Sequence, residues 1–159
     1  MSASDDEIAA IVERLDLAPH PEGGYFAETY RSERNAGERA FSTAIYFLVT
    51  AASPSRMHRV AADEMWHFYR GDPLEMLALG PSGRSHVASI GSDLAAGQSP
   101  QVLVPAGTWQ GTRVAPGGRY ALVGATVTPG FDFADFEMGD AETLIAACPA
   151  HADLIRALS

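Results

Sequence analysis

Two segments of the chain carry side chains that could do chemistry together. In the first, HRVAADEMWHFYRGD, His58 stands six residues before Glu64, and Gly71 follows seven residues later. In the second, VPAGTWQG, a Pro-x-Gly turn precedes Gln110. A histidine and a carboxylate on neighbouring strand ends can share one metal ion or one proton, and such a turn can bring a distant strand into register with them. We therefore expect His58, Glu64 and Gln110 to converge.

The residues that follow Glu64 suggest an aromatic floor beside it. Side chains alternate between the two faces of a strand, so if Glu64 points inward, Trp66 and Phe68 do so as well. This floor would suit a sugar or another ring, although a core that needs large side chains would give the same pattern. His67 lies an odd number of residues from Glu64, which places it on the opposite face unless a bulge intervenes.

The segment HPEGGYFAETYRS at 20–32 is a second source of acid and base groups. A Gly-Gly pair permits a tight turn before a strand. His20, Glu22 and Glu28 can supply acid–base groups at a cavity mouth, and Tyr25 or Tyr30 can supply a hydroxyl that donates a proton. The alternative is an edge strand that pairs across a dimer interface, where Tyr and Arg are enriched.

A third feature, TPGFDFADFE, interleaves three phenylalanines with carboxylates. Rings at this density can stack on a base or a sugar, but the carboxylates would repel a phosphorylated ligand. Simple packing is the other interpretation, in which Phe131 and Phe133 seal the end of a barrel beneath the last helices. We interpret the single Cys148 as a small apolar packing residue.

The elements that must position these residues are mostly short strands. Segment 4–16 predicts an amphipathic helix, because its apolar residues recur at helical spacing and Ser4 and Glu7 form a capping box. Asp140 caps a second helix and Pro149 fits the first turn of a third, within 140–158. Between them lie nine short runs that alternate with turn signals, which is typical of an all-β sandwich or barrel over 20–137. The runs are 24–31, 42–50, 57–60, 64–70, 74–79, 84–90, 101–104, 108–113 and 119–128.

Composition excludes several classes of function. The chain has 159 residues, 47% hydrophobic and 19% charged, which predicts a single domain over 1–159. Its net charge of -9 disfavours nucleic acid and anionic membranes as partners, and no apolar run is long enough to span a bilayer. The absence of Lys excludes Schiff-base and P-loop chemistry. The single cysteine and the lack of a leader segment lead us to expect a cytoplasmic protein.

The segments quoted above resemble the cupin superfamily. The chain is similar to the branch of predicted sugar-epimerase-type cupins that share an HPEGGYF-type opening. Further matching segments are STAIYFL, GQSPQVLVPAGTWQG and LVGATVTPGFDFADFE. In the cupin motifs H-x-H-x(3,4)-E-x(6)-G and P-x-G-x-x-H, His58, Glu64 and Gly71 match. Val60 stands in place of the second histidine and Gln110 in place of the third. The resemblance implies an all-β double-stranded β-helix, a jelly roll that is commonly dimeric and has a ligand cavity inside the barrel.

The resemblance also implies a metal set and several possible functions. His58, Glu64 and Gln110 would be the ligands of a divalent metal ion, although valine cannot bind a metal and an amide oxygen binds it weakly. The competing arrangement is a cavity in which these three residues hydrogen-bond a ligand or each other. His67 would be a fourth ligand only if a strand bulge turned it inward.

Three hypotheses follow for a small-molecule ligand in a homodimer. The first is a sugar epimerase or isomerase, with His58 as base, Tyr25 or Tyr30 as acid, and Glu64 orienting His58. The second is a module that binds or senses a ring-bearing metabolite without altering it, held by Trp66, Phe68 and Trp109. The third is a metal-dependent lyase, isomerase or dioxygenase. The ligand-binding candidates across these hypotheses are Trp66, Phe68, Trp109, Gln110, Glu28 and His67.

Overall fold

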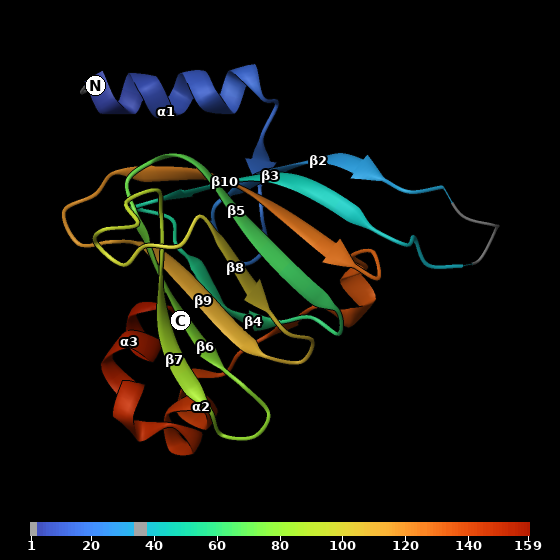
Figure 1. The fold of residues 1–159 in the computed structure, drawn as a ribbon, viewed down its shortest axis with the longest axis vertical. Coiled ribbons are helices and arrows are strands. Elements are labelled where there is room, and N and C mark those ends of the chain that lie inside the picture. The colour runs from blue at the N-terminus through green and yellow to red at the C-terminus, as the bar shows by residue number, and fades with distance from the viewer. Residues whose placement is uncertain (1–2, 34–37) are drawn as a thin grey trace.

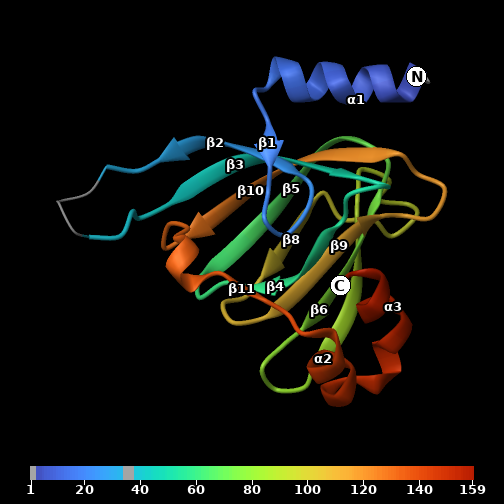
Figure 2. The same ribbon diagram turned by 180° about the vertical axis from the view of Figure 1, so that it is seen from behind.

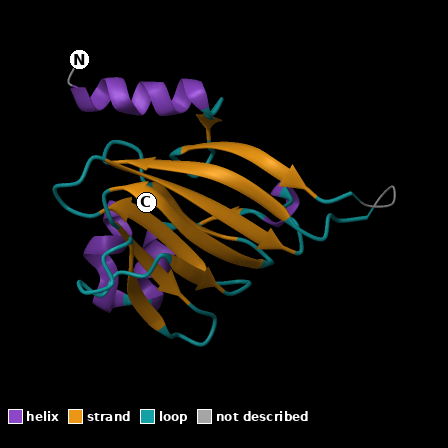
Figure 3. Ribbon diagram, turned by 45° about the horizontal axis from the view of Figure 1, so that its top comes forward, coloured by secondary structure: helices purple, strands orange, loops and turns teal. Residues whose placement is uncertain are grey.

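The computed structural model describes residues 3–33 and 38–159 and shows two antiparallel sheets that face each other (Figures 1 and 3). One sheet has the order β1-β2-β3-β10-β5-β8, and the other has the order β11-β4-β9-β6-β7. The strands are β1 (Ala18–Pro19), β2 (Tyr25–Arg31), β3 (Thr43–Thr50), β4 (Ser55–Arg59), β5 (Asp63–Gly71), β6 (Leu74–Leu79), β7 (Ser85–Ile90), β8 (Gln101–Val104), β9 (Trp109–Val114), β10 (Tyr120–Thr128) and β11 (Glu137–Met138). This confirms the predicted all-β jelly roll.

The main core lies between the two sheets and follows strand alternation. Phe47 and Val49 of β3 point inward and meet Leu74 and Met76 of β6 from the opposite sheet. Trp66 of β5 completes this layer, and its ring packs edge-on to Phe47 at a centroid distance of 5.6 Å. Since every second residue of these strands faces inward, each strand has a matching outer face that needs its own cover.

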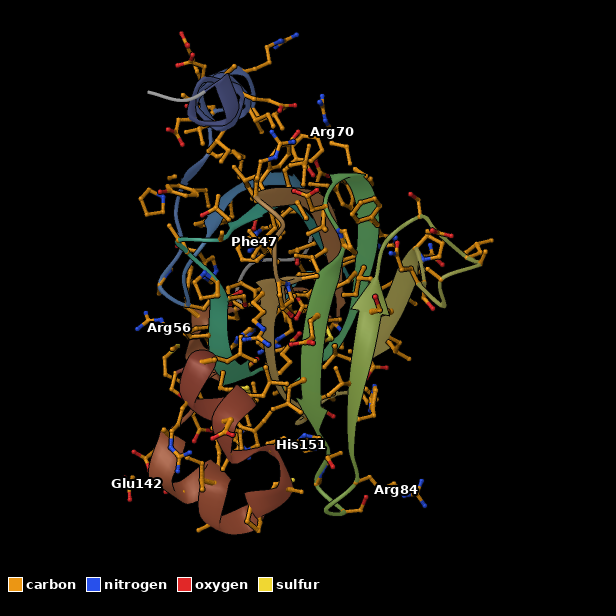
Figure 4. The ribbon with its side chains drawn as sticks, turned by 90° about the vertical axis from the view of Figure 1, so that its left-hand side faces the viewer. Phe47, Arg56, Arg70, Arg84, Glu142 and His151 are labelled. Carbon is orange, nitrogen blue, oxygen red and sulfur yellow. The ribbon has the colours of Figure 1, made fainter. Side chains whose placement is uncertain are left out.

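The N-terminal helix α1 (Ala3–Arg14) covers part of the outer face of the six-stranded sheet (Figures 1 and 2). Its apolar stripe packs on Leu48 of β3 and Leu122 of β10, whose side chains point away from the main core. Arg70 lies next to this helix (Figure 4) and donates a 2.7 Å hydrogen bond to Glu7. The helix was predicted over 4–16, and in the structure it begins one residue earlier and ends two residues earlier, at Arg14.

The C-terminal helices cover the outer face of the five-stranded sheet (Figure 1). They are α2 (Ala141–Ala147) and α3 (Ala152–Ala157), joined by the 3-10 turn η2 (Pro149–His151). Asp140 caps α2 by accepting the backbone N–H of Thr143 at 2.9 Å, as predicted. Leu144, Ile155 and Leu158 are buried in the same cluster as Met57 and Leu77. None of the helices in 3–33 and 38–159 has the length and apolar character that a bilayer-spanning helix needs.

Candidate active site

His58 stands at the centre of a buried polar cluster on the inner face of β4. Its side chain is 3% exposed. Nδ1 lies 2.7 Å from the backbone carbonyl oxygen of Arg56, and because a carbonyl can only accept, Nδ1 carries the proton. Nε2 is then free to accept and lies 3.1 Å from Oε2 of Glu22. Burial lowers the pKa of His58 below its ordinary value, while the charge of Glu64 raises it. His58 is therefore neutral with its basic nitrogen directed at a carboxyl group.

Glu22 reaches His58 from the turn that precedes β2. The turn closes through hydrogen bonds between His20 and Gly24 (3.0 Å) and between Gly23 and His20 (3.0 Å). The hydroxyl of Ser55 donates to Oε1 of Glu22 at 2.7 Å. Burial raises the pKa of Glu22 to about 8, against the hydrogen bond from Ser55 and the charge of Arg56, which both lower it. At neutral pH, Glu22 is mostly protonated and can donate its proton to Nε2 of His58.

His20 is a second neutral imidazole beside the same carboxyl group. Its Nδ1 accepts the backbone N–H of Glu22 at 3.2 Å, so the ring proton is on Nε2. Burial and then the charge of His58 lower the pKa of His20 to about 4. The ring stacks on Phe133 at a centroid distance of 6.0 Å, and His58 stacks on Phe136 at 5.5 Å. The two imidazoles thus form the polar side of a mostly aromatic wall.

Glu64 is held by a chain of hydrogen bonds that begins at Trp66. The indole N–H of Trp66 donates to Oε1 of Gln110 at 3.0 Å, and the amide nitrogen of Gln110 donates to Oε2 of Glu64 at 2.5 Å. An indole N–H can only donate, so this contact fixes which end of the amide carries the oxygen. Burial is the main cause that raises the pKa of Glu64 to about 7; the charge of Glu22 also raises it, while His58 and Gln110 lower it. Glu64 is therefore an oriented carboxyl group that titrates near neutrality.

A cavity of about 70 Å³ inside the barrel is lined by His20, Glu22, His58 and Glu64. Val60 also lines it, at the position where a second histidine was absent from the sequence motif. Arg31 and Glu28 lie at the lining too, and Arg31 binds Glu28 through two hydrogen bonds of 2.9 and 2.8 Å. The remaining lining residues are mostly apolar: Phe26, Thr43, Ile45, Phe47, Trp66, Ala125, Val127, Phe131 and Phe133.

The phenylalanines of TPGFDFADFE form part of this lining and do not pack beneath the last helices as one interpretation had predicted. Phe131 and Phe133 meet edge-on at a centroid distance of 4.9 Å, next to the 3-10 turn η1 (Phe133–Asp135). The C-terminal helices instead cover the outer face of the five-stranded sheet. The reason is that β11 pairs with β4 at the edge of that sheet. This pairing places Met138 opposite His58, so the chain passes the cavity before α2 begins.

The residues predicted as a metal set do converge, but they do not fit a divalent cation. A metal needs lone pairs directed at one point, whereas Gln110 turns an N–H donor toward Glu64 and directs its oxygen at the indole of Trp66. The arrangement of His58 leaves only Nε2 for a metal, because the Arg56 carbonyl holds Nδ1, and Nε2 lies 3.1 Å from Oε2 of Glu22. Within the described part of the chain, no group of three or more His, Cys, Asp and Glu side chains has the arrangement of a metal site.

Strand alternation separates several other predicted site residues from the cavity. Trp109 immediately precedes Gln110, so it faces outward, where it packs with the C-terminal helices and under the guanidinium of Arg59 at 4.5 Å. His67 also faces outward, and its Nε2 lies 2.9 Å from the hydroxyl of Thr126. Phe68 faces inward but packs in the main core and is not a lining residue.

The two tyrosines considered as proton donors lie elsewhere in the fold. Tyr25 packs in the cluster under α1, on the outer face of β2. A bulge between Glu28 and Tyr30 changes the register of β2 and leaves Tyr30 57% exposed. The same bulge explains why Arg31, three residues after Glu28, still lines the cavity. Neither tyrosine therefore supports the acid role.

His20 and Glu22 were predicted at a cavity mouth, but their interactions with His58 and the contribution of Ser55 were not predicted. Ser55 lies three residues before His58, which would normally put the two side chains on opposite faces of β4. A register shift between these two residues brings both inward. The sequence signal for the contact with His58 was the position of His20 and Glu22 just before the Gly-Gly pair of HPEGG, because a turn there can direct both side chains into the barrel.

Comparison with known proteins shows the family. A family model described as "Cupin superfamily (DUF985)" matches residues 9–139. The chain is 28% identical over 153 residues to "Uncharacterized protein YML079W" of Saccharomyces cerevisiae, a match that covers 85% of this chain and 76% of that protein.

Two solved structures are similar over nearly their whole length. Protein SO0799 from Shewanella oneidensis superposes with a TM-score of 0.88 at 39% identity, covering 100% of this chain and 98% of that one. A hypothetical protein from Leishmania major superposes with a TM-score of 0.84 at 34% identity, and the match covers 93% of this chain and 96% of that one. Oxalate decarboxylase from Bacillus subtilis is 14% identical with a TM-score of 0.57, over 89% of this chain and 37% of that enzyme, which shows the fold alone. The chain belongs to the cupin superfamily and, within it, to the DUF985 family.

Proposed function

We propose that the protein binds a small carbohydrate-like metabolite in the barrel cavity and moves a proton at a carbon atom beside a carbonyl group, as a sugar epimerase or isomerase does. The observation that carries this proposal is the buried pair formed by His58 and Glu22. Nε2 of His58 meets Oε2 of Glu22 at 3.1 Å, while Nδ1 is held by a backbone carbonyl 2.7 Å away. This pair can pass one proton between two groups without leaving the cavity.

The pKa values of the two glutamates suit an exchange of protons near neutrality. Glu64, whose pKa is raised to about 7, can lose its proton near neutrality and serves as the base. Glu22, with a pKa raised to about 8, holds a proton and serves as the acid, oriented by Nε2 of His58 at 3.1 Å. Epimerisation needs both kinds of group in one enclosed site, because the carbon loses a proton on one face and regains it on the other.

The size of the cavity limits what the reacting end of the ligand can be. One water molecule needs about 10 to 15 Å³ of such enclosed space, so about 70 Å³ admits several waters or the reacting end of a small metabolite. The rest of the ligand would lie between the phenylalanines and Arg31 at the lining. A nucleotide sugar fits poorly, because its diphosphate needs several convergent cations and Arg31 is already bound to Glu28.

The experiment that tests this proposal is solvent exchange. The protein is incubated in deuterated buffer with small hydroxycarbonyl compounds, from glyceraldehyde to hexoses, and NMR follows the signal of the hydrogen beside the carbonyl. We expect loss of this signal with the native protein and at least a tenfold slower loss with Glu22→Gln or Glu64→Gln. Glu75→Gln is the matched control, since Glu75 binds Arg113 at 2.7 Å and does not line the cavity. Exchange that survives both cavity substitutions would refute the assignment.

The second candidate is a module that binds its ligand without altering it. The observation that favours it is the aromatic wall, in which His58 and His20 stack on phenylalanines and hold fixed positions. Saturable binding of the same compounds with no deuterium incorporation at any pH would establish this function in place of the first.

A further inference from the structure

The cavity encloses more negative than positive groups. Three glutamates and one arginine line it: Glu22, Glu28, Glu64 and Arg31. Arg31 is occupied by Glu28 through both its Nε and one terminal nitrogen. Glu22 and Glu64 therefore share the interior with two imidazoles that burial keeps neutral.

Neither interior glutamate has a permanent cation as a partner among the described residues. Glu22 is 7% exposed and Glu64 8%, and the ion-pair contacts of Glu22 are with histidines only. The guanidinium of Arg56 is near, but it donates to the backbone carbonyls of Pro21 and Glu22 at 2.7 and 3.1 Å. The whole sequence contains no lysine. A buried carboxyl group without a cation holds its proton until a positive charge arrives, so two such groups at one cavity favour a ligand that brings that charge.

The part of the lining formed by Phe131 and Phe133 also favours a cationic ligand. The rings of Phe131 and Phe133 face the cavity, and the negative face of an aromatic ring attracts cations. Between them in the sequence, Asp132 accepts the backbone N–H of Ala134 at 2.9 Å. The hydrogen bond with Glu28 is the main cause that raises the pKa of the Arg31 guanidinium, and the charge of Asp132 adds to it. An ammonium group at this part of the lining would lie near aromatic rings, and the one cation there, Arg31, has its charge offset by Glu28.

We infer that the natural ligand carries a protonated primary amine, as an amino sugar or a small amino alcohol does, and that its ammonium group lies between Glu22 and Glu64. The inference rests on the proposed function in taking this cavity as the ligand site. It adds the charge of the ligand, which the proton transfer itself does not specify. An ammonium donates three hydrogen bonds and can contact both carboxyl groups, and its charge favours their ionised forms, whereas a hydroxyl donates one hydrogen bond and brings no charge.

The test compares pairs of probes that differ only by amine and hydroxyl. Serinol is paired with glycerol, and glucosamine with glucose, and calorimetry at neutral pH gives each dissociation constant. We expect at least one amine to bind about tenfold or more tightly than its hydroxyl partner, since charge-assisted hydrogen bonds are roughly twice as strong as neutral ones. Glu22→Gln and Glu64→Gln preserve the shape of the side chains and should each reduce that ratio to near one, while Glu75→Gln should leave it unchanged.

Several results would overturn the inference. They are equal or tighter binding of the hydroxyl partner in both pairs, no binding of any of the four probes, and a preference for amines that survives both cavity substitutions. Deuterium exchange measured on the same samples reports separately on the proposed function. A preference for amines without deuterium exchange would support the inference about the ligand and refute the proposed proton transfer. Exchange on neutral sugars without a preference for amines would support the proton transfer and refute the inference.

Discussion

The two buried glutamates make the stability of the fold depend on pH, and Glu22 provides the clearest case. Its carboxyl pKa rises from an ordinary value of 4.5 to about 8 in the folded chain. The folded state therefore binds a proton that the unfolded state has released, and the free energy of unfolding falls as the pH rises. The contribution of Glu22 is fully present below about pH 4.5 and is lost as the pH passes through about 8.

The size of the effect follows from this shift. One pKa unit corresponds to about 1.4 kcal/mol, so between about pH 7 and pH 8.5 Glu22 should lower the free energy of unfolding by about 1 kcal/mol. Glu64, with a pKa of about 7, is mostly ionised over this interval and should add a smaller decrease. His20, whose pKa falls to about 4, acts in the opposite direction and mainly below pH 6.5, its ordinary value. The chosen interval thus reports chiefly on Glu22.

The assay is urea unfolding at both pH values, followed by tryptophan fluorescence. Wild type and Glu75→Gln should both lose roughly 1 to 2 kcal/mol between about pH 7 and pH 8.5, and Glu22→Gln should lose less than about half as much. Equal stability of the wild type at the two pH values would refute the reasoning. So would an unchanged decrease in Glu22→Gln, since another group would then be responsible.

Two further substitutions test how the site is held. Trp66→Phe removes the indole N–H that meets Gln110, so the free energy of unfolding should fall by about 1 to 3 kcal/mol in urea titrations, and a change within error would contradict the role of this bond. Gly23→Ala should cost more than about 2 kcal/mol, because Gly23 has φ +109° and a Cβ there would collide with the carbonyl oxygen of Pro54. Gly83→Ala is its control at φ +73° with open space around the Cβ, and similar losses in the two variants would show that backbone strain alone acts.

Much of the fold could be predicted from the sequence because alternation and turn signals act locally. Each of the nine predicted runs overlaps a strand, for example 64–70 with β5 and 101–104 with β8. The two-residue strands β1 and β11 were missed, since two residues are too few to show a period. The convergence of His58, Glu64 and Gln110 was also predicted, because a known motif supplied the pairing of β4 with β9 that local pattern does not contain.

The parts of the site that escaped prediction depend on irregular backbone and on contacts between distant segments. The inward position of Ser55 comes from a register shift in β4, and no pattern in the sequence of this strand predicts that shift. The approach of Glu22 to His58 depends on a turn packed against the carbonyl of Pro54. The misplacement of Trp109 had a simpler cause: as the neighbour of Gln110 on one strand, it could not share the same face, and alternation alone predicts its outward position.

The hydrogen-bond chain from Trp66 through Gln110 to Glu64 has an evolutionary consequence. A histidine at position 110 could satisfy both neighbours as a neutral ring, but ligation of a metal through either nitrogen would deprive one neighbour of its partner in a buried setting. Val60 would have to change as well, since its side chain has no lone pair to offer. Conversion of this barrel into a metal-binding relative would therefore require replacements at both position 60 and position 110, and metal ligation at position 110 would cost one of the two buried hydrogen bonds made there.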